Sequence, residues 1–90
     1  MKRVHIIVKG FVQGVFFRSN TKKAATELNL KGYVKNLDNG YVEVVAEGKE
    51  KELNKLIEFC KVGPSFSKVE DIDIKFGKPT KEFNNFEVRY

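Results

Sequence analysis

Residues 4–18 read VHIIVKGFVQGVFFR, and this stretch changes its pattern twice. Its first part has the two-residue period of a β-strand, with one apolar face formed by Val4, Ile6 and Val8. Residues 10–14 contain two glycines and predict a loop, and a helical pattern begins at Phe17. The stretch therefore predicts a strand, a loop and a helix in direct succession.

The rest of the chain continues to alternate between strand and helix patterns. The expected elements are a helix from Phe17 to Leu28, strands over 31–37 and 41–47, a helix over 49–61, a strand through 72–76 and a short strand over 86–90. Asn39-Gly40 supplies the positive φ angles of a hairpin turn, and Gly63-Pro64 ends the second helix. The resulting order is β-α-β-β-α-β followed by one more strand.

This order predicts an α+β fold, a ferredoxin-like α/β sandwich with one antiparallel sheet and two helices on one face. In that topology the strands at 4–8 and 41–47 are central neighbours, which suits their valine and isoleucine content. Residues 1–90 are expected to form one domain, since this length supplies one core. The fold alone does not decide the function, because this architecture hosts enzymes, RNA binders and regulatory domains.

The charge balance favours a small anionic ligand. The chain has 17 basic and 12 acidic residues, a formal net charge of +5. Basic and acidic residues interleave over 49–58, and no three basic residues are consecutive, so a strong nucleic-acid footprint is not expected. The positive surplus suits a phosphate ester or anhydride.

Few residues could support metal or thiol chemistry. The single Cys60 and the single His5 exclude an intrachain disulfide and a Cys-rich zinc site, and no acidic cluster predicts a magnesium site. Cys60 falls on the apolar face of its helix, and His5 has no evident carboxylate partner, so both are expected to be structural. Apolar runs of at most three residues predict no transmembrane helix or signal peptide, and hence a soluble, cytoplasmic protein.

The loop before Phe17 has the chemistry of an anion site. Backbone N–H groups at a helix start lack internal partners, and a glycine-containing loop lets them surround an anion. Arg18 follows, and its planar guanidinium can hold two phosphate oxygens at once. The alternative is an ordinary turn followed by a solvated arginine. The loop is mostly apolar, which indicates a packed, rigid backbone and favours the anion site.

A second candidate residue, Asn36, stands just before the hairpin turn at 38–40. One interpretation is that its amide points from the sheet toward the Arg18 loop, where it could bind water through a donor and an acceptor. The alternative is that Asn36 only begins the turn, a role that asparagine often has.

Taken together, these segments resemble the acylphosphatase family. A first signature spans residues 8–18 and matches at Gly10, Val12, Gln13, Gly14, Val15, Phe17 and Arg18. A second spans residues 32–48 and matches at Gly32, Tyr33, Val34, Lys35, Asn36, Gly40, Val42 and Gly48. Gly63-Pro64 and residues 85–90 extend the likeness over nearly the whole chain. It departs at Asn29 and Asn39, where many members have glycine and aspartate, but both are turn positions that tolerate asparagine.

The resemblance implies hydrolysis of the carboxyl–phosphate anhydride of acyl phosphates to a carboxylate and inorganic phosphate, without a metal or cofactor. It implies that Arg18 binds the phosphoryl oxygens together with backbone N–H groups of Gln13, Gly14, Val15, Phe16 and Phe17. Asn36 is expected to hold the attacking water. The resemblance also suggests that the carboxylate of Tyr90 approaches Arg18. The expected partners are the acyl phosphate and its phosphate product, with no specific nucleic acid and no membrane, and the protein is expected to be a monomer.

Two other functions fit the same architecture. Lys9-Gly10-Phe11 is similar to the start of an RNA-recognition signature, but the residues that follow do not continue it, and that signature belongs on the third strand. The second alternative is a phosphate-binding module with a regulatory role and no catalysis. The presence of both Arg18 and Asn36 favours catalysis over such a module.

Overall fold

Two helices and five strands make up the computed structural model, which covers residues 1–90. In chain order they are β1 (Lys2–Phe11), α1 (Phe17–Glu27), β2 (Lys31–Asn36), β3 (Val42–Gly48), α2 (Glu50–Val62), β4 (Lys68–Gly77) and β5 (Phe86–Arg89). This order confirms the predicted β-α-β-β-α-β pattern with one added strand. Neither helix is long and apolar enough to span a membrane.

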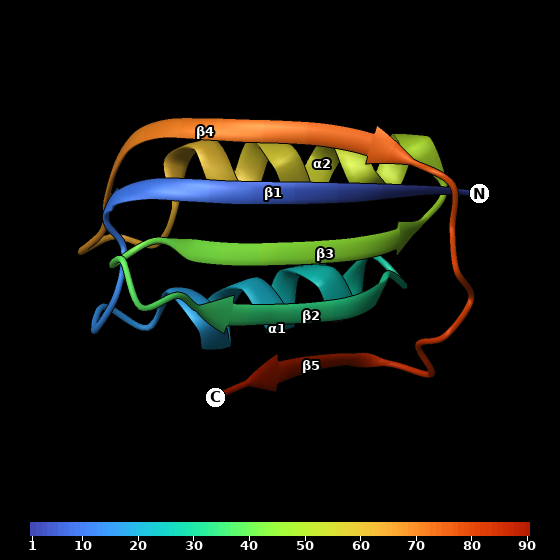
Figure 1. The fold of residues 1–90 in the computed structure, drawn as a ribbon, viewed down its shortest axis with the longest axis horizontal. Coiled ribbons are helices and arrows are strands. Elements are labelled where there is room, and N and C mark those ends of the chain that lie inside the picture. The colour runs from blue at the N-terminus through green and yellow to red at the C-terminus, as the bar shows by residue number, and fades with distance from the viewer.

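The five strands form one sheet in the order β4-β1-β3-β2-β5, with both helices behind the same face (Figure 1). The pairs β4–β1, β1–β3 and β3–β2 are antiparallel, and β1 and β3 are central neighbours, which confirms the ferredoxin-like sandwich. β5 instead runs parallel to β2, so the expectation of a wholly antiparallel sheet is wrong for this strand. The reason is visible in Figure 1: the chain leaves β4 at one edge and crosses to the opposite edge before it forms β5.

The core lies between the sheet and the two helices. The inward face of β1 and β3 is fully buried at Val4, Ile6, Val8, Val42, Val44 and Ala46. α2 meets it with residues at positions i, i+3, i+4 and i+7, namely Leu53, Leu56, Ile57 and Cys60. Burial of each large aliphatic side chain stabilises the fold by roughly 1.5–3 kcal/mol. The core therefore anchors β1 and β3, and the loop that leads to α1 leaves the end of β1.

β1 continues through Gly10, where the sequence predicts a loop. The register with β4 shifts between Lys9 and Gly10, and Gly10 has a φ of 129°. A Cβ atom at this position would lie 2.2 Å from the carbonyl oxygen of Lys68, so only glycine fits the bulge. The glycine therefore serves the close approach of two strands, and the loop begins after Phe11.

Candidate active site

The segment Val12–Phe16, here called the cradle loop, connects β1 to α1. Val12 and Val15 are buried in the core, and they anchor the loop from inside. The sequence predicts a packed loop, and this is correct for these two residues but wrong for two phenylalanines. Phe11 and Phe16 are 62% and 74% exposed. The loop is thus packed into the core through Val12 and Val15, while the side chains of Phe11 and Phe16 face solvent.

Backbone geometry turns the cradle loop sharply into the helix. Gly14 and Phe16 have positive φ angles of 73° and 62°, and the latter is uncommon for a bulky residue. The carbonyl of Phe16 accepts hydrogen bonds from the backbone N–H of Asn20 and from its side-chain Nδ2. No side chain caps the start of α1, and its first turn contains no acidic residue. The first N–H groups of α1 therefore have no competing acceptor of the kind that would block an anion.

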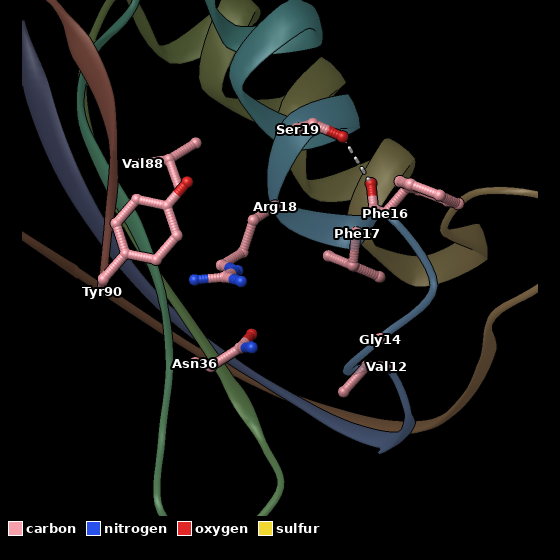
Figure 2. A pocket seen from close by; sticks show the side chains of 9 residues that line it. All are labelled: Val12, Gly14, Phe16, Phe17, Arg18, Ser19, Asn36, Val88 and Tyr90. Carbon is pink, nitrogen blue, oxygen red and sulfur yellow. Dashed lines mark hydrogen bonds between the residues drawn. The ribbon is translucent and has the colours of Figure 1, made fainter.

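A cavity of about 310 Å³ opens at this end of the sheet (Figure 2). Nine residues line it: Val12, Gly14, Phe16, Phe17, Arg18, Ser19, Asn36, Val88 and Tyr90. The structure thus brings together five of the seven predicted site residues. Gln13 and Val15 are not among the lining residues.

Arg18 lies in the first turn of α1 and points into the cavity (Figure 2). None of the eight ion pairs of the structure includes it. One guanidinium nitrogen donates a long hydrogen bond of 3.4 Å to the carbonyl of Arg89. The aromatic ring of Tyr90 lies 4.7 Å from the guanidinium carbon. The C-terminal residues therefore contact Arg18, but through this carbonyl and this ring, whereas the resemblance suggested the Tyr90 carboxylate.

Asn36 is the last residue of β2 and pairs with Val42 across the sheet. The hairpin turn is closed after it, by a hydrogen bond from the N–H of Leu37 to the carbonyl of Tyr41. The Oδ1 atom of Asn36 is buried, and it is the one buried side-chain polar atom of the chain without a hydrogen-bond partner. Its amide is directed toward the space below the Arg18 guanidinium (Figure 2). A buried acceptor without a partner carries a desolvation penalty of about 1–3 kcal/mol, which a bound water or ligand would remove.

Three lining residues were missed by sequence reasoning: Val12 as a lining side chain, Ser19 and Val88. Ser19 directly follows Arg18 at the helix start, so its position was readable. Val88 reaches the cavity only because β5 pairs in parallel with β2, where it lies opposite Val34. No local pattern in the sequence signals that pairing.

The two residues expected to be structural lie away from the cavity, although one expectation needs correction. Cys60 is fully buried, and this burial raises the pKa of its thiol to about 12. His5 does have a carboxylate partner, because its Nε2 lies 2.8 Å from Glu43. The sequence could not show this pair, since it depends on the register of β1 and β3, in which Glu43 lies opposite Ile7. Burial raises the pKa of Glu43, but hydrogen bonds from His5 and Tyr33 outweigh it and lower the pKa overall.

Comparison with known proteins identifies the family. The acylphosphatase family model matches residues 4–88. An acylphosphatase of Syntrophus aciditrophicus (strain SB) is 51% identical over 90 residues, covering 100% of this chain and 94% of that protein. The crystal structure of the acylphosphatase from Bacillus subtilis superposes with a TM-score of 0.96 at 41% identity and full coverage of both chains. Full-length HypF, solved in a phosphate- and nucleotide-bound form, matches with a TM-score of 0.88 at 32% identity, over 100% of this chain and 12% of that one. The chain therefore belongs to the acylphosphatase family of hydrolases.

Proposed function

We propose that the protein hydrolyses acyl phosphates to a carboxylate and inorganic phosphate without a metal ion. The observation that carries this proposal is the pairing of two unsatisfied groups in one cavity. The guanidinium of Arg18 has no carboxylate partner, and the buried Oδ1 of Asn36 has no hydrogen-bond partner. A phosphoryl group would give the Arg18 guanidinium an anionic partner, and a water molecule would donate a hydrogen bond to Asn36 Oδ1.

In this mechanism the phosphoryl group lies against the cradle loop. Arg18 holds two of its oxygens, and backbone N–H groups between Gln13 and Phe17 donate to the others. Charge stabilisation and positioning account for most catalysis of phosphoryl transfer, so a small site of this kind is sufficient. The positive φ angles at Gly14 and Phe16 support the proposal, because they curve the backbone around the cavity.

Asn36 orients the attacking water in line with the leaving group. Its Oδ1 accepts a hydrogen bond from the water, which fixes the direction of the oxygen lone pair toward phosphorus. The leaving group is a carboxylate, a weak base whose conjugate acid has a pKa of about 4–5. It departs without a general acid, and an oxygen of the substrate takes the proton of the water. No Asp, Glu or His side chain lines the cavity, which supports this assignment.

The types of residue around the cavity support a reaction without a metal ion. No group of three or more His, Cys, Asp or Glu side chains is arranged to hold a metal ion. Arg18 and the backbone N–H groups supply the positive charge that a metal supplies in other phosphoryl-transfer sites. We therefore expect turnover to continue in excess EDTA.

The test is hydrolysis of a synthetic aryl acyl phosphate by the purified protein in excess EDTA, beside a phosphate monoester. We expect rapid turnover of the acyl phosphate alone, with none in the Arg18→Ala variant. Stabilisation of the fold by inorganic phosphate is measured in parallel by thermal melting. Phosphate stabilisation without turnover would instead indicate a phosphate-binding module.

A further inference from the structure

We propose that the side chain of Gln13 is a positioning residue that sets the location of the cradle loop relative to Asn36. This inference rests on the proposed function, since it concerns the geometry of the same site. Gln13 does not line the cavity, so its side chain touches neither phosphate nor water directly. It acts through the hairpin that carries Asn36.

The two donors of the Gln13 amide are both used, and both cross to the β2–β3 hairpin. Nε2 donates to the carbonyl of Leu37 at 2.7 Å and to the carbonyl of Tyr41 at 2.9 Å. Leu37 directly follows Asn36, and Tyr41 directly precedes its partner Val42. One amide group thus binds both arms of the hairpin at the level of Asn36.

No other polar contact links the cradle loop to the hairpin. None of the backbone hydrogen bonds outside helices and strands involves residues 12–15. Gly14 has open space around its Cα, with no atom within 4 Å of a Cβ built there. The buried side chains of Val12 and Val15 fix the depth of the loop, but apolar contacts are not directional. The direction and distance to Asn36 therefore depend on the two hydrogen bonds of Gln13.

The chemistry of the amide suits this position. A glutamate would present only acceptors to the two carbonyl oxygens and would add negative charge beside the phosphoryl group. A neutral amide donates twice, keeps its hydrogen bonds at every pH and leaves the positive potential around Arg18 unchanged. Glutamine is therefore the residue that can connect these two segments without opposing an anionic substrate.

The test is a double-mutant cycle between Gln13→Met, which keeps the length of the side chain but has no donor, and Asn36→Ala. We expect Gln13→Met to lower kcat by about tenfold to a hundredfold, with the phosphate dissociation constant within about twofold of the wild type. Because Gln13 acts through Asn36, Gln13→Met should have little further effect in the Asn36→Ala background. Losses that multiply, or a phosphate affinity that falls by about tenfold, would overturn the proposal.

A matched control separates positioning from simple loss of stability. Asn39→Ala removes the hydrogen bond from the N–H of Tyr41 to Asn39 Oδ1, at 3.0 Å in the same hairpin. We expect it to lower the melting temperature while kcat stays within about twofold of the wild type. An equal loss of kcat in Asn39→Ala would show that any disturbance of the turn has the effect attributed to Gln13.

A second readout does not depend on turnover. The side-chain amide signal of Asn36 is followed by nuclear magnetic resonance during titration with inorganic phosphate. We expect the phosphate-induced shift to be at least halved in Gln13→Met, while the shift at the backbone of Arg18 is kept. An unchanged Asn36 response would refute the role of Gln13, even if the wild type proved inactive and the proposed function failed.

Discussion

The two ends of the sheet differ in how far their buried polar groups are hydrogen-bonded within the protein. At the cavity end, Asn36 has a buried oxygen without a partner, and Arg18 makes one long hydrogen bond of 3.4 Å. At the other end, the carboxylate of Glu47, only 3% exposed, accepts four hydrogen bonds. Its donors are Arg3, Thr80 and Lys81, the last two in the segment 78–85 that crosses from β4 to β5. The two ends are roughly 17 Å apart along β3, which rises about 3.4 Å per residue.

The difference is that the protein itself satisfies the buried polar group at one end and leaves the buried polar group at the other end without a partner. A buried carboxylate with four hydrogen bonds holds the crossing segment to the sheet, and this segment delivers β5 to its edge. A buried amide oxygen that no protein group satisfies can accept a hydrogen bond from water or a ligand. We therefore expect changes at the cavity end to reduce activity and changes at the Glu47 end to reduce stability.

The largest effect is expected from Arg18→Ala. Loss of the guanidinium removes the charge that faces the phosphoryl oxygens, so kcat/KM should fall by about three orders of magnitude or more. Stabilisation by phosphate should disappear as well, while the melting temperature without phosphate stays close to that of the wild type. The control is Arg18→Lys, which keeps the charge but not the two-pronged geometry, and should recover only part of the activity.

The next largest effect is expected from Asn36→Ala. Its kcat should fall by about a hundredfold or more, because the attacking water loses its orientation, while phosphate stabilisation is kept. Removal of the unpaired oxygen should leave the free energy of unfolding unchanged or raise it by up to about 1 kcal/mol. Kinetics and urea unfolding of the same preparation check both parts. A normal turnover number would exclude Asn36 from the reaction.

Glu47→Gln should have the opposite pattern, with a loss of stability and little change in kcat. The amide cannot accept all four hydrogen bonds and leaves Arg3 without its buried partner, so the free energy of unfolding should fall by about 2–3 kcal/mol. Well below the melting temperature, kcat should stay within about twofold of the wild type. The matched control is Glu87→Gln, where an exposed pair with Arg89 is lost and about 0.5 kcal/mol or less is expected. A kcat loss as large as that of Asn36→Ala would contradict the comparison.

Acid should reduce the stability of the protein through the same residue, Glu47. Burial raises the pKa of Glu47, but its hydrogen bonds with Thr80, Arg3 and Lys81 outweigh this and hold the pKa below its ordinary value of 4.5. The stabilisation is therefore complete above that value and is lost as the pH falls through the lowered pKa. We expect the melting temperature of the wild type to drop between about pH 5 and pH 3, and a flatter dependence in Glu47→Gln. Equal slopes for the two proteins would show that other carboxylates govern acid unfolding.

The smallest effect is expected from Tyr90→Leu. The ring lies against the guanidinium of Arg18, and such contacts contribute about 0.5–1 kcal/mol at exposed sites. We expect kcat/KM to fall by about twofold to fivefold, because Arg18 samples more orientations. Removal of Arg89 and Tyr90 together should lower kcat/KM further, since the hydrogen bond from Arg18 to the carbonyl of Arg89 is lost too. Full activity after that deletion would rule out any role of these residues in holding Arg18.

Much of the fold follows from local pattern. The alternation at Val4, Ile6 and Val8 and the helical spacing of α2 predict elements that the structure confirms. Asn29, expected to end the first helix, has a φ of 58°, the left-handed geometry that asparagine tolerates. The parallel β5 was not predictable, because its pairing joins residues more than fifty positions apart and has no local signature.

The candidate site likewise has a part that was predictable from local sequence and a part that depends on distant segments. Sequence reasoning selected Arg18 and Asn36, since the types of residue and their places after a strand and before a turn carry the chemistry. It attributed to Gln13 only a backbone donor, and it did not single out Glu47. The side-chain bonds of both residues reach segments that are distant along the chain.

Residue type and short-range spacing were enough to predict the elements, the family and the groups available to bind an anion. Which of these groups meet depends on tertiary contacts. The tertiary structure left Asn36 Oδ1 without a partner beneath Arg18, placed Tyr90 against that guanidinium and gave His5 a carboxylate neighbour. The physical reason is that burial, pairing and orientation depend on strand register and on the crossing of the chain between sheet edges, and these are properties of the whole fold.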